Sequence, residues 1–236
     1  MPNEMTVEVL QRGLAFHGGG VLKAGSHKEG SGEFCASEFS AIMRGKPVFD
    51  FSDDLPDIRA MNDAFGSNDL ERTKCLLPVI AALWDWNAWD KTRRQRFVER
   101  LTVLTIQKII GQLPTVGENA KAKCLKATNL FEASLAAQAA QPAALLASAT
   151  YSAVGWAVEA AWASHTGAVD ASVAAEMVVQ AGAKAAAWAA ANAAEAAAKA
   201  SEVAASAVAV TKDAARALVL RVACNIWIEA AIYSGS

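Results

Sequence analysis

The 236-residue sequence has few cysteines and almost no excess charge of either sign. Its four cysteines, Cys35, Cys75, Cys124 and Cys224, lie far apart and form no CxxC pair. This distribution disfavours a disulfide framework and indicates a reducing cytoplasm. With 22 basic and 24 acidic residues the net charge is -2, so the chain as a whole has no electrostatic preference for nucleic acid. The N-terminus, MPNEMTVEVLQRG, has no basic region followed by an apolar core, which disfavours a signal peptide.

The common motifs of nucleotide-binding and hydrolytic enzymes are also missing. The sequence contains no G-x4-GK[ST], no G-x-G-x-x-G after a strand, no HExxH and no G-x-S-x-G. The usual arguments for a nucleotide-binding protein, a dehydrogenase, a zincin or an α/β-hydrolase therefore do not apply.

A local basic segment, DKTRRQRFVERL, carries Arg93, Arg94, Arg96 and Arg100. Aspartate and glutamate are interleaved with these arginines, which favours a solvated helix face over a nucleic-acid patch.

A long uncharged segment raises the question of a membrane span. No charge occurs between Glu132 and Glu159, and 53% of the chain is hydrophobic. The segment is nevertheless mostly alanine, which buries little apolar area, and it includes Gln138, Gln141 and Pro142. A membrane-acting helix over residues 133–158 stays open as a minor alternative.

Composition divides the chain into three parts. Residues 1 to about 57 hold most of the glycine and predict loops around a few short elements. From Cys75 to about Gly111 the pattern is helical, first with Pro78 in an opening turn and then in a helix that ends at Gly111. Apolar residues recur at helical spacing within this part: Val79, Leu83, Trp86, Phe97, Leu101 and Leu104.

The third part, from about Glu118 to Tyr233, is alanine-rich and predicts helix throughout. An unbroken helix from Val169 to Tyr233 would be on the order of 100 Å long, so we expect breaks near Gly182 and before Thr211. Its tryptophans need burial in a core or in an interface with a second copy. They are Trp156, Trp162, Trp188 and Trp227.

One stretch, GSHKEGSGEFCASEF at residues 25–39, concentrates residue types that carry chemistry. Cys35 is predicted in the first turn of a helix that Gly45 ends, where the helix dipole would lower the thiol pKa. Glu38 follows one turn later on the same face. His27 lies in the preceding loop, close enough in sequence to fold back onto the cysteine.

Three interpretations of this stretch remain open. Cys35 could be a nucleophile with His27 as base and Asp53 as orienting carboxylate. Alternatively, His27, Cys35 and Cys75 could hold zinc with Glu38 or Asp53 as the fourth ligand. In the structural interpretation, Cys35 is a buried residue, Glu38 caps the loop and His27 hydrogen-bonds a carbonyl. The spacing H-x7-C-x2-E matches no standard signature, so the structural interpretation is favoured.

The motifs GSH, CASEFSAIMRGKP, FSD, CLLPVIAAL, WN and DKTRRQRF occur in this order before the alanine-rich tail. In this the chain resembles a family of bacterial and bacteriophage proteins that has no assigned activity. It departs from the family pattern in the inserted segment DLPDIRAMNDAFGSNDLERTK before Cys75. The resemblance implies a bacterial or phage origin, and it marks these positions: His27, Cys35, Glu38, Gly45, Ser52, Asp53, Cys75, Pro78, Trp86, Asn87, Arg94, Gln95 and Arg96.

Together these observations predict an all-α protein, with a glycine-rich motif module at 1–114 packed on a bundle of alanine-rich helices at 115–236. The expected function is that of a non-enzymatic cytoplasmic accessory protein that binds a protein or small ligand. Small residues at helix seams predict a homo-oligomer. The alternatives are a Cys- or metal-dependent hydrolase centred on His27 and Cys35, with zinc as the expected metal, and the membrane-acting helix.

Overall fold

The structure is a computed structural model that describes residues 5–28, 30–48, 55–56, 58–109, 111, 117–140 and 205–235. These residues form eight α-helices, one 3-10 turn and no strand, which confirms the all-α prediction. The chain divides into two compact units, Met1–Asp90 (unit 1) and Lys91–Ser236 (unit 2). The composition of the sequence predicts this division at residue 114. In the structure the helix that follows Asp90 packs with the C-terminal helices, a contact that composition does not reveal.

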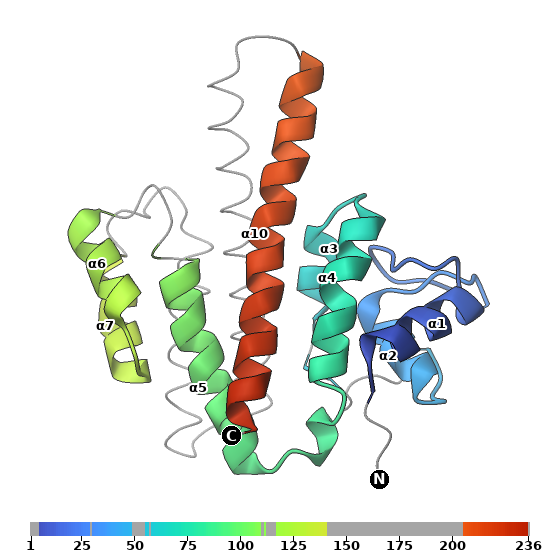
Figure 1. Cartoon of the computed structure of the whole chain (residues 1–236), viewed down its shortest axis with the longest axis horizontal. Coiled ribbons are helices and arrows are strands. Elements are labelled where there is room, and N and C mark those ends of the chain that lie inside the picture. Colours follow the sequence, from blue (N-terminus) through green and yellow to red (C-terminus); the bar gives the residue numbers. More distant parts are fainter. Residues whose placement is uncertain are drawn as a thin grey trace. The chain divides into compact units, whose positions relative to one another are not determined.

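Unit 1 is built from four short α-helices and a 3-10 turn (Figure 1). These elements are α1 (Val7–His17), α2 (Ala36–Met43), α3 (Arg59–Ala64), α4 (Asp69–Ala82) and η1 (Trp86–Ala88). Helices α1 and α2 both pack against α4, and α2 also contacts α1 and α3. The core of unit 1 includes Leu10, Leu14, Phe39, Ile58, Met61, Leu76, Ile80 and Leu83, all fully or almost fully buried.

Helix α2 ends where the sequence predicts. Gly45 has a φ of 70°, a left-handed conformation that glycine adopts without a Cβ penalty. Its N–H donates to the carbonyl of Ile42 at 2.9 Å, and the N–H of Lys46 donates to that of Ala41 at 3.0 Å. This pair of hydrogen bonds is a Schellman motif, which satisfies the last carbonyls of the helix.

The prediction that Pro78 lies in a first turn is wrong. Helix α4 begins at Asp69, so Pro78 lies inside it. The helix starts early because Asn68 is its N-cap, with Oδ1 accepting the N–H of Glu71 at 3.2 Å. Pro78 has no N–H to donate to the carbonyl of Lys74 one turn back.

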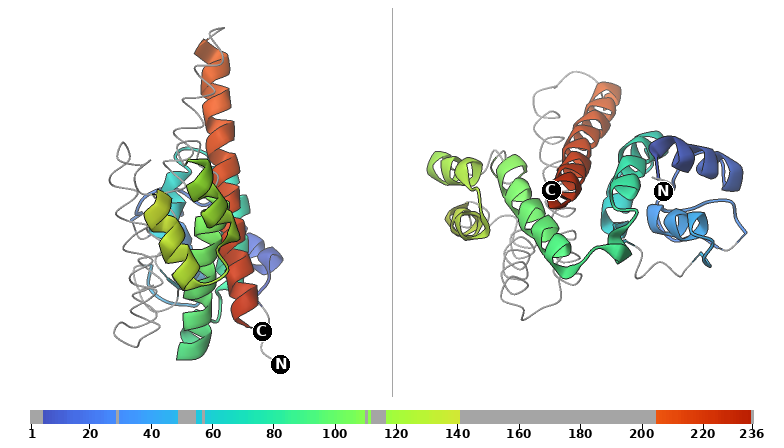
Figure 2. Two further views of the ribbon diagram at one scale, coloured as in Figure 1. Left: turned by 90° about the vertical axis from the view of Figure 1, so that its left-hand side faces the viewer. Right: turned by 60° about the horizontal axis from the view of Figure 1, so that its bottom comes forward.

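Unit 2 contains four described helices (Figure 2). They are α5 (Lys91–Lys108), α6 (Glu118–Lys126), α7 (Leu130–Ala140) and α10 (Ala205–Ser234). Helix α5 packs along α10, where the rings of Phe97 and Trp227 meet edge to face with centroids 5.6 Å apart. Helices α6 and α7 form a hairpin that packs against α5. Arg100 of α5 donates to Glu229 of α10 at 2.8 Å, and Lys108 donates to the same carboxylate.

Helix α10 runs through Thr211, so the predicted break there is wrong. The other predicted break, Gly182, lies outside the described residues. Trp227 is 2% exposed and confirms its predicted place in a core, whereas Trp156, Trp162 and Trp188 lie outside the described residues. Within the described part of the chain, Ala217–Ser234 is long and apolar enough to cross a membrane, and 50% of it is buried in the structure. A buried helix of a soluble core has the same length and composition.

Candidate functional site

The stretch at residues 25–39 folds around one buried carboxylate, that of Glu38. Glu38 is 1% exposed, and its two oxygens accept three hydrogen bonds. The backbone N–H of His27 donates to Oε1 at 2.9 Å, and the backbone N–H of Cys35 donates to Oε2 at 2.8 Å. His27 Nδ1 lies 2.9 Å from Oε2. Because a carboxylate accepts hydrogen bonds, His27 carries its proton on Nδ1 in this pair.

Cys35 is the N-cap of α2, and with Glu38 it forms a capping box. Its side chain is buried, and burial raises the pKa of the Cys35 thiol to about 12, with the adjacent Glu38 charge adding to the increase. The predicted lowering of this pKa is therefore wrong, since removal of the thiol from water outweighs the hydrogen bonds from the backbone N–H groups of Glu38 and Ser37, which lower the pKa. A thiol in this state is a poor nucleophile at neutral pH.

The structure brings His27 and Glu38 together but does not assemble the predicted metal ligands. Among the described residues, no three His, Cys, Asp or Glu side chains lie close enough together to hold a metal ion. The set His27, Cys35, Glu38 and Cys75 is therefore not gathered into a zinc site. All four cysteines are buried, and Cys75 is part of α4. Asp53, the predicted orienting residue, lies outside the described residues.

The structural interpretation predicts that His27 hydrogen-bonds a carbonyl. In the structure His27 instead hydrogen-bonds the Glu38 carboxylate, which caps the loop. The three donors on Glu38 come from the loop and from the start of α2. They fix the loop to the helix that follows it. In this structure, His27, Cys35 and Glu38 form a capping arrangement.

The glycine-rich loop, which connects α1 to α2, is also held by Asn62 of α3. Asn62 is fully buried, and its Oδ1 accepts the N–H of Ala36 at 3.2 Å. Its Nδ2 donates to the carbonyl of Lys23 at 2.8 Å. The neighbouring Asp63 accepts the N–H of Gly25 at 2.8 Å. The side chains of Asn62 and Asp63 therefore satisfy backbone groups at both ends of the glycine-rich loop.

Arg72 of α4 is the second anchor of the loop, and its side chain is fully buried. Its Nε donates to the carbonyl of Asn62 at 2.9 Å, and Nη1 donates to that of Leu22 at 3.1 Å. It also donates to the carbonyl of Gly66 and to the carboxylate of Asp69. A buried guanidinium needs this many acceptors, because each N–H left unpaired would cost about 1–3 kcal/mol.

Asp69 links Arg72 to Lys23, whose Nζ lies 2.7 Å from Asp69 Oδ2. Burial acts to raise the pKa of the Asp69 carboxyl, but the hydrogen bonds and charges of Lys23 and Arg72 outweigh burial and hold that pKa below its usual value. The ion pair of Lys23 and Asp69 closes the base of the loop. At the same place the N–H of Leu22 donates to Thr73 Oγ1 at 2.8 Å.

The anchoring side chains of Asn62, Asp63, Asp69 and Arg72 all belong to the inserted segment DLPDIRAMNDAFGSNDLERTK, for which the sequence predicts no role. The sequence contains one indication that Arg72 is buried. Arg72 precedes Leu76 by four residues and Val79 by seven, so it shares the buried face of α4. An arginine on an apolar face needs acceptors from another part of the chain.

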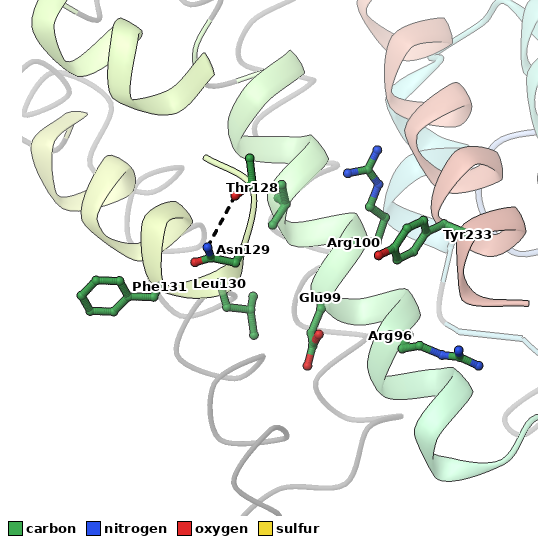
Figure 3. A pocket seen from close by; sticks show the side chains of 9 residues that line it. Arg96, Glu99, Arg100, Thr128, Asn129, Leu130, Phe131 and Tyr233 are labelled. Carbon is green, nitrogen blue, oxygen red and sulfur yellow. Dashed lines mark hydrogen bonds between the residues drawn. The ribbon is translucent and has the colours of Figure 1, made fainter. Parts of the chain in front are cut away.

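Unit 2 contains an open pocket of about 350 Å³ (Figure 3). Residues from α5, from the turn that begins α7 and from the end of α10 line it: Arg96, Glu99, Arg100, Val103, Thr128, Asn129, Leu130, Phe131 and Tyr233. The Tyr233 ring centre lies 5.1 Å from Cζ of Arg100. None of these residues belongs to the cysteine–histidine stretch. The sequence predicts Arg96 and Arg100 only as part of a solvated helix face.

No protein-family model, curated protein or solved structure matches the chain. The resemblance to bacterial and bacteriophage proteins therefore stays a prediction.

Proposed function

We propose that the chain is a non-enzymatic accessory protein of the bacterial cytoplasm, of phage or bacterial origin. It self-associates through its alanine-rich C-terminal helices and binds a protein or small ligand through unit 2.

The observation that carries this proposal is the exposed apolar surface of α10. Leu218 is 62% exposed and Ile232 is 68% exposed, and they are four helical turns apart on one side of the helix. Asn225 lies between them on the same side. A groove of about 460 Å³ adjoins it, lined by Ile228, Ile232 and Tyr233 together with Arg100, Asn225 and Glu229. A second copy of the chain would remove this apolar surface from water.

The contacts of the N-terminal stretch support a non-enzymatic role. The Glu38 carboxylate accepts three internal hydrogen bonds, and the Cys35 thiol is buried with a raised pKa. A Cys/His hydrolase needs the opposite arrangement, an accessible thiol beside a base. The burial of Cys35 therefore counts against the hydrolase alternative.

Sedimentation equilibrium of the full chain at micromolar concentration tests self-association. The wild-type chain is expected to be a dimer or larger, and Ile232→Glu is expected to shift it toward monomer because a charge would be buried in the interface. Leu70→Glu is the matched control, since Leu70 is a 64% exposed leucine of unit 1. A monomeric wild-type chain, or equal effects of the two substitutions, would remove the basis of this proposal.

A further inference from the structure

The pocket of unit 2 has two arginines on one wall. Arg96 and Arg100 are four residues apart on α5, so their side chains leave the same face of the helix one turn apart, as Figure 3 shows. Like charges at this spacing destabilise a helix by about 0.2–0.5 kcal/mol. Arg100 has a structural role in its ion pair with Glu229, but no such ion pair accounts for Arg96 among the described residues, so an anion in the pocket would be attracted mainly by Arg96.

The two arginines differ in what they already contact. Arg100 is held in place by Glu229, with Nη2 and Oε1 2.8 Å apart, and by the Tyr233 ring. Arg96 is exposed, and within the described ranges no carboxylate forms an ion pair with it. Arg96 can therefore turn its guanidinium toward a ligand without breaking an internal ion pair, while Arg100 fixes the position of the Tyr233 ring.

The charge of the lining limits the charge of the ligand. The lining carries Arg96, Arg100 and the carboxylate of Glu99, and the charge of Arg100 is already paired with Glu229, which leaves Arg96 as the cation that a ligand can pair with. Glu99 accepts a hydrogen bond from Gln95 at 3.3 Å. This balance suits an anion of one negative charge and disfavours polyphosphates, which would meet the Glu99 carboxylate.

The rest of the lining combines apolar and aromatic side chains with the polar residues Thr128 and Asn129. Val103 and Leu130 form part of the wall, while Phe131 is 61% exposed and Tyr233 is 54% exposed at the pocket. At about 350 Å³ the pocket is at the small end of the range typical of small-molecule sites, about 300–1,000 Å³. An exposed tyrosine ring beside an arginine offers a flat surface on which a ring of the ligand can stack.

We propose that this pocket binds a small aromatic or otherwise flat organic monoanion, such as an aromatic carboxylate. The acidic group pairs with Arg96, and the flat apolar part lies against Tyr233 and Leu130. The inference rests on the proposed function in so far as it gives a ligand class to unit 2, but it does not require self-association.

Isothermal titration calorimetry with two probes of the same ring tests the charge requirement. 1-Naphthoate carries one negative charge, and 1-naphthalenemethanol is its neutral counterpart. The wild-type chain is expected to bind the carboxylate more tightly than the alcohol. Arg96→Gln is expected to weaken carboxylate binding about tenfold, the loss of one charge-assisted contact, and to leave alcohol binding unchanged. Arg12→Gln, at an exposed arginine of α1, is the charge-matched control and should bind both probes as the wild type does.

The inference is overturned if the wild-type chain binds the two probes equally, or if Arg96→Gln binds naphthoate as tightly as the wild type. Sedimentation of the same samples separates this result from the proposed function. If the chain self-associates but does not prefer naphthoate, only the ligand inference is contradicted. If the chain is a monomer and binds naphthoate through Arg96, only the proposed self-association is contradicted.

Discussion

His27, which is partly buried, pairs with the buried Glu38, and Nδ1 of the imidazole lies 2.9 Å from Oε2 of the carboxylate. The same carboxylate accepts the backbone N–H groups of His27 and Cys35. One side chain thus satisfies donors from both ends of the glycine-rich loop. The residues that suggest a reactive centre in the sequence therefore close a loop onto a helix in the structure.

Replacing Glu38 by alanine is expected to destabilise this loop strongly. The substitution leaves three donors without an acceptor, each worth about 1–3 kcal/mol when buried. Because part of this cost is relieved by water, we expect a loss of about 2–4 kcal/mol in the free energy of opening. Amide hydrogen exchange across residues 25–39 measures it.

Glu33→Ala is the control for Glu38→Ala, because Glu33 lies in the same loop but is exposed. Its effect is expected to stay within about 0.5 kcal/mol. If the two substitutions accelerated exchange equally, the Glu38 carboxylate would not be what holds the loop.

Cys35 is expected to react slowly with iodoacetamide in the native chain at neutral pH. Its side chain is 2% exposed, so the reagent has little access to the sulfur. Its pKa is raised to about 12, so very little of the reactive thiolate is present at neutral pH. Mass spectrometry of alkylated peptides gives the rate for each cysteine. After unfolding in urea, Cys35 should react as fast as the other three. Native labelling of Cys35 ahead of the others would instead favour the thiol-hydrolase alternative.

Local sequence patterns predict local features of this fold well. Alanine content and apolar spacing predict an all-α chain, the spacing of Phe97, Leu101 and Leu104 predicts the buried side of α5, and Gly45 predicts the end of α2. Each of these features depends on neighbours within about one or two helical turns. The apolar run around Pro78 does not predict the start of α4, because the Asn68 cap lies before that run.

Contacts between distant residues were not predictable in the same way. Arg72 meets the carbonyl of Leu22, and Asn62 meets that of Lys23, each pair far apart along the chain. The spacing of apolar residues in the sequence does not indicate which loop carbonyl a buried side chain will contact. The lowered pKa that the sequence predicts for Cys35 is wrong for a related reason, since the position of Cys35 at a helix start is a local property and its burial is a tertiary one.

The ion pairs of Glu229 make the stability of unit 2 depend on pH. The hydrogen bond from Lys108 lowers the pKa of the Glu229 carboxyl, burial opposes this change, and Arg100 lowers the pKa further. A carboxyl whose folded pKa is depressed stabilises the fold above its unfolded pKa of about 4.3 and loses that contribution as the pH falls through the folded pKa. Glu229 is 39% exposed, so the contribution at neutral pH is expected to be only about 0.2–1 kcal/mol.

Urea unfolding of Glu229→Gln and wild type across this pH range measures the contribution. The difference between them should be present at neutral pH and disappear in acid. Glu118→Gln removes the same charge from a side chain that is 92% exposed and only 3.9 Å from Lys121 within the same helix, so its difference from wild type should be smaller than that of Glu229→Gln. A Glu229→Gln effect that did not change with pH would mean that packing, not charge, is lost.

Gly18 is required by close packing rather than by its backbone angles. Its φ of -167° is extended, but a Cβ there would lie 2.0 Å from the carbonyl oxygen of Gly32 and 2.8 Å from Cε2 of Phe34. Gly18→Ala must therefore push apart the end of α1 and the glycine-rich loop, at a cost of about 2–3 kcal/mol. Gly20→Ala is the matched control, because Gly20 has open space around it and a φ of 75°, so only backbone strain of about 1 kcal/mol is expected. Amide exchange in α1 and in residues 31–35 should rise more in Gly18→Ala than in Gly20→Ala, whereas the reverse order would show that this contact does not hold the loop against α1.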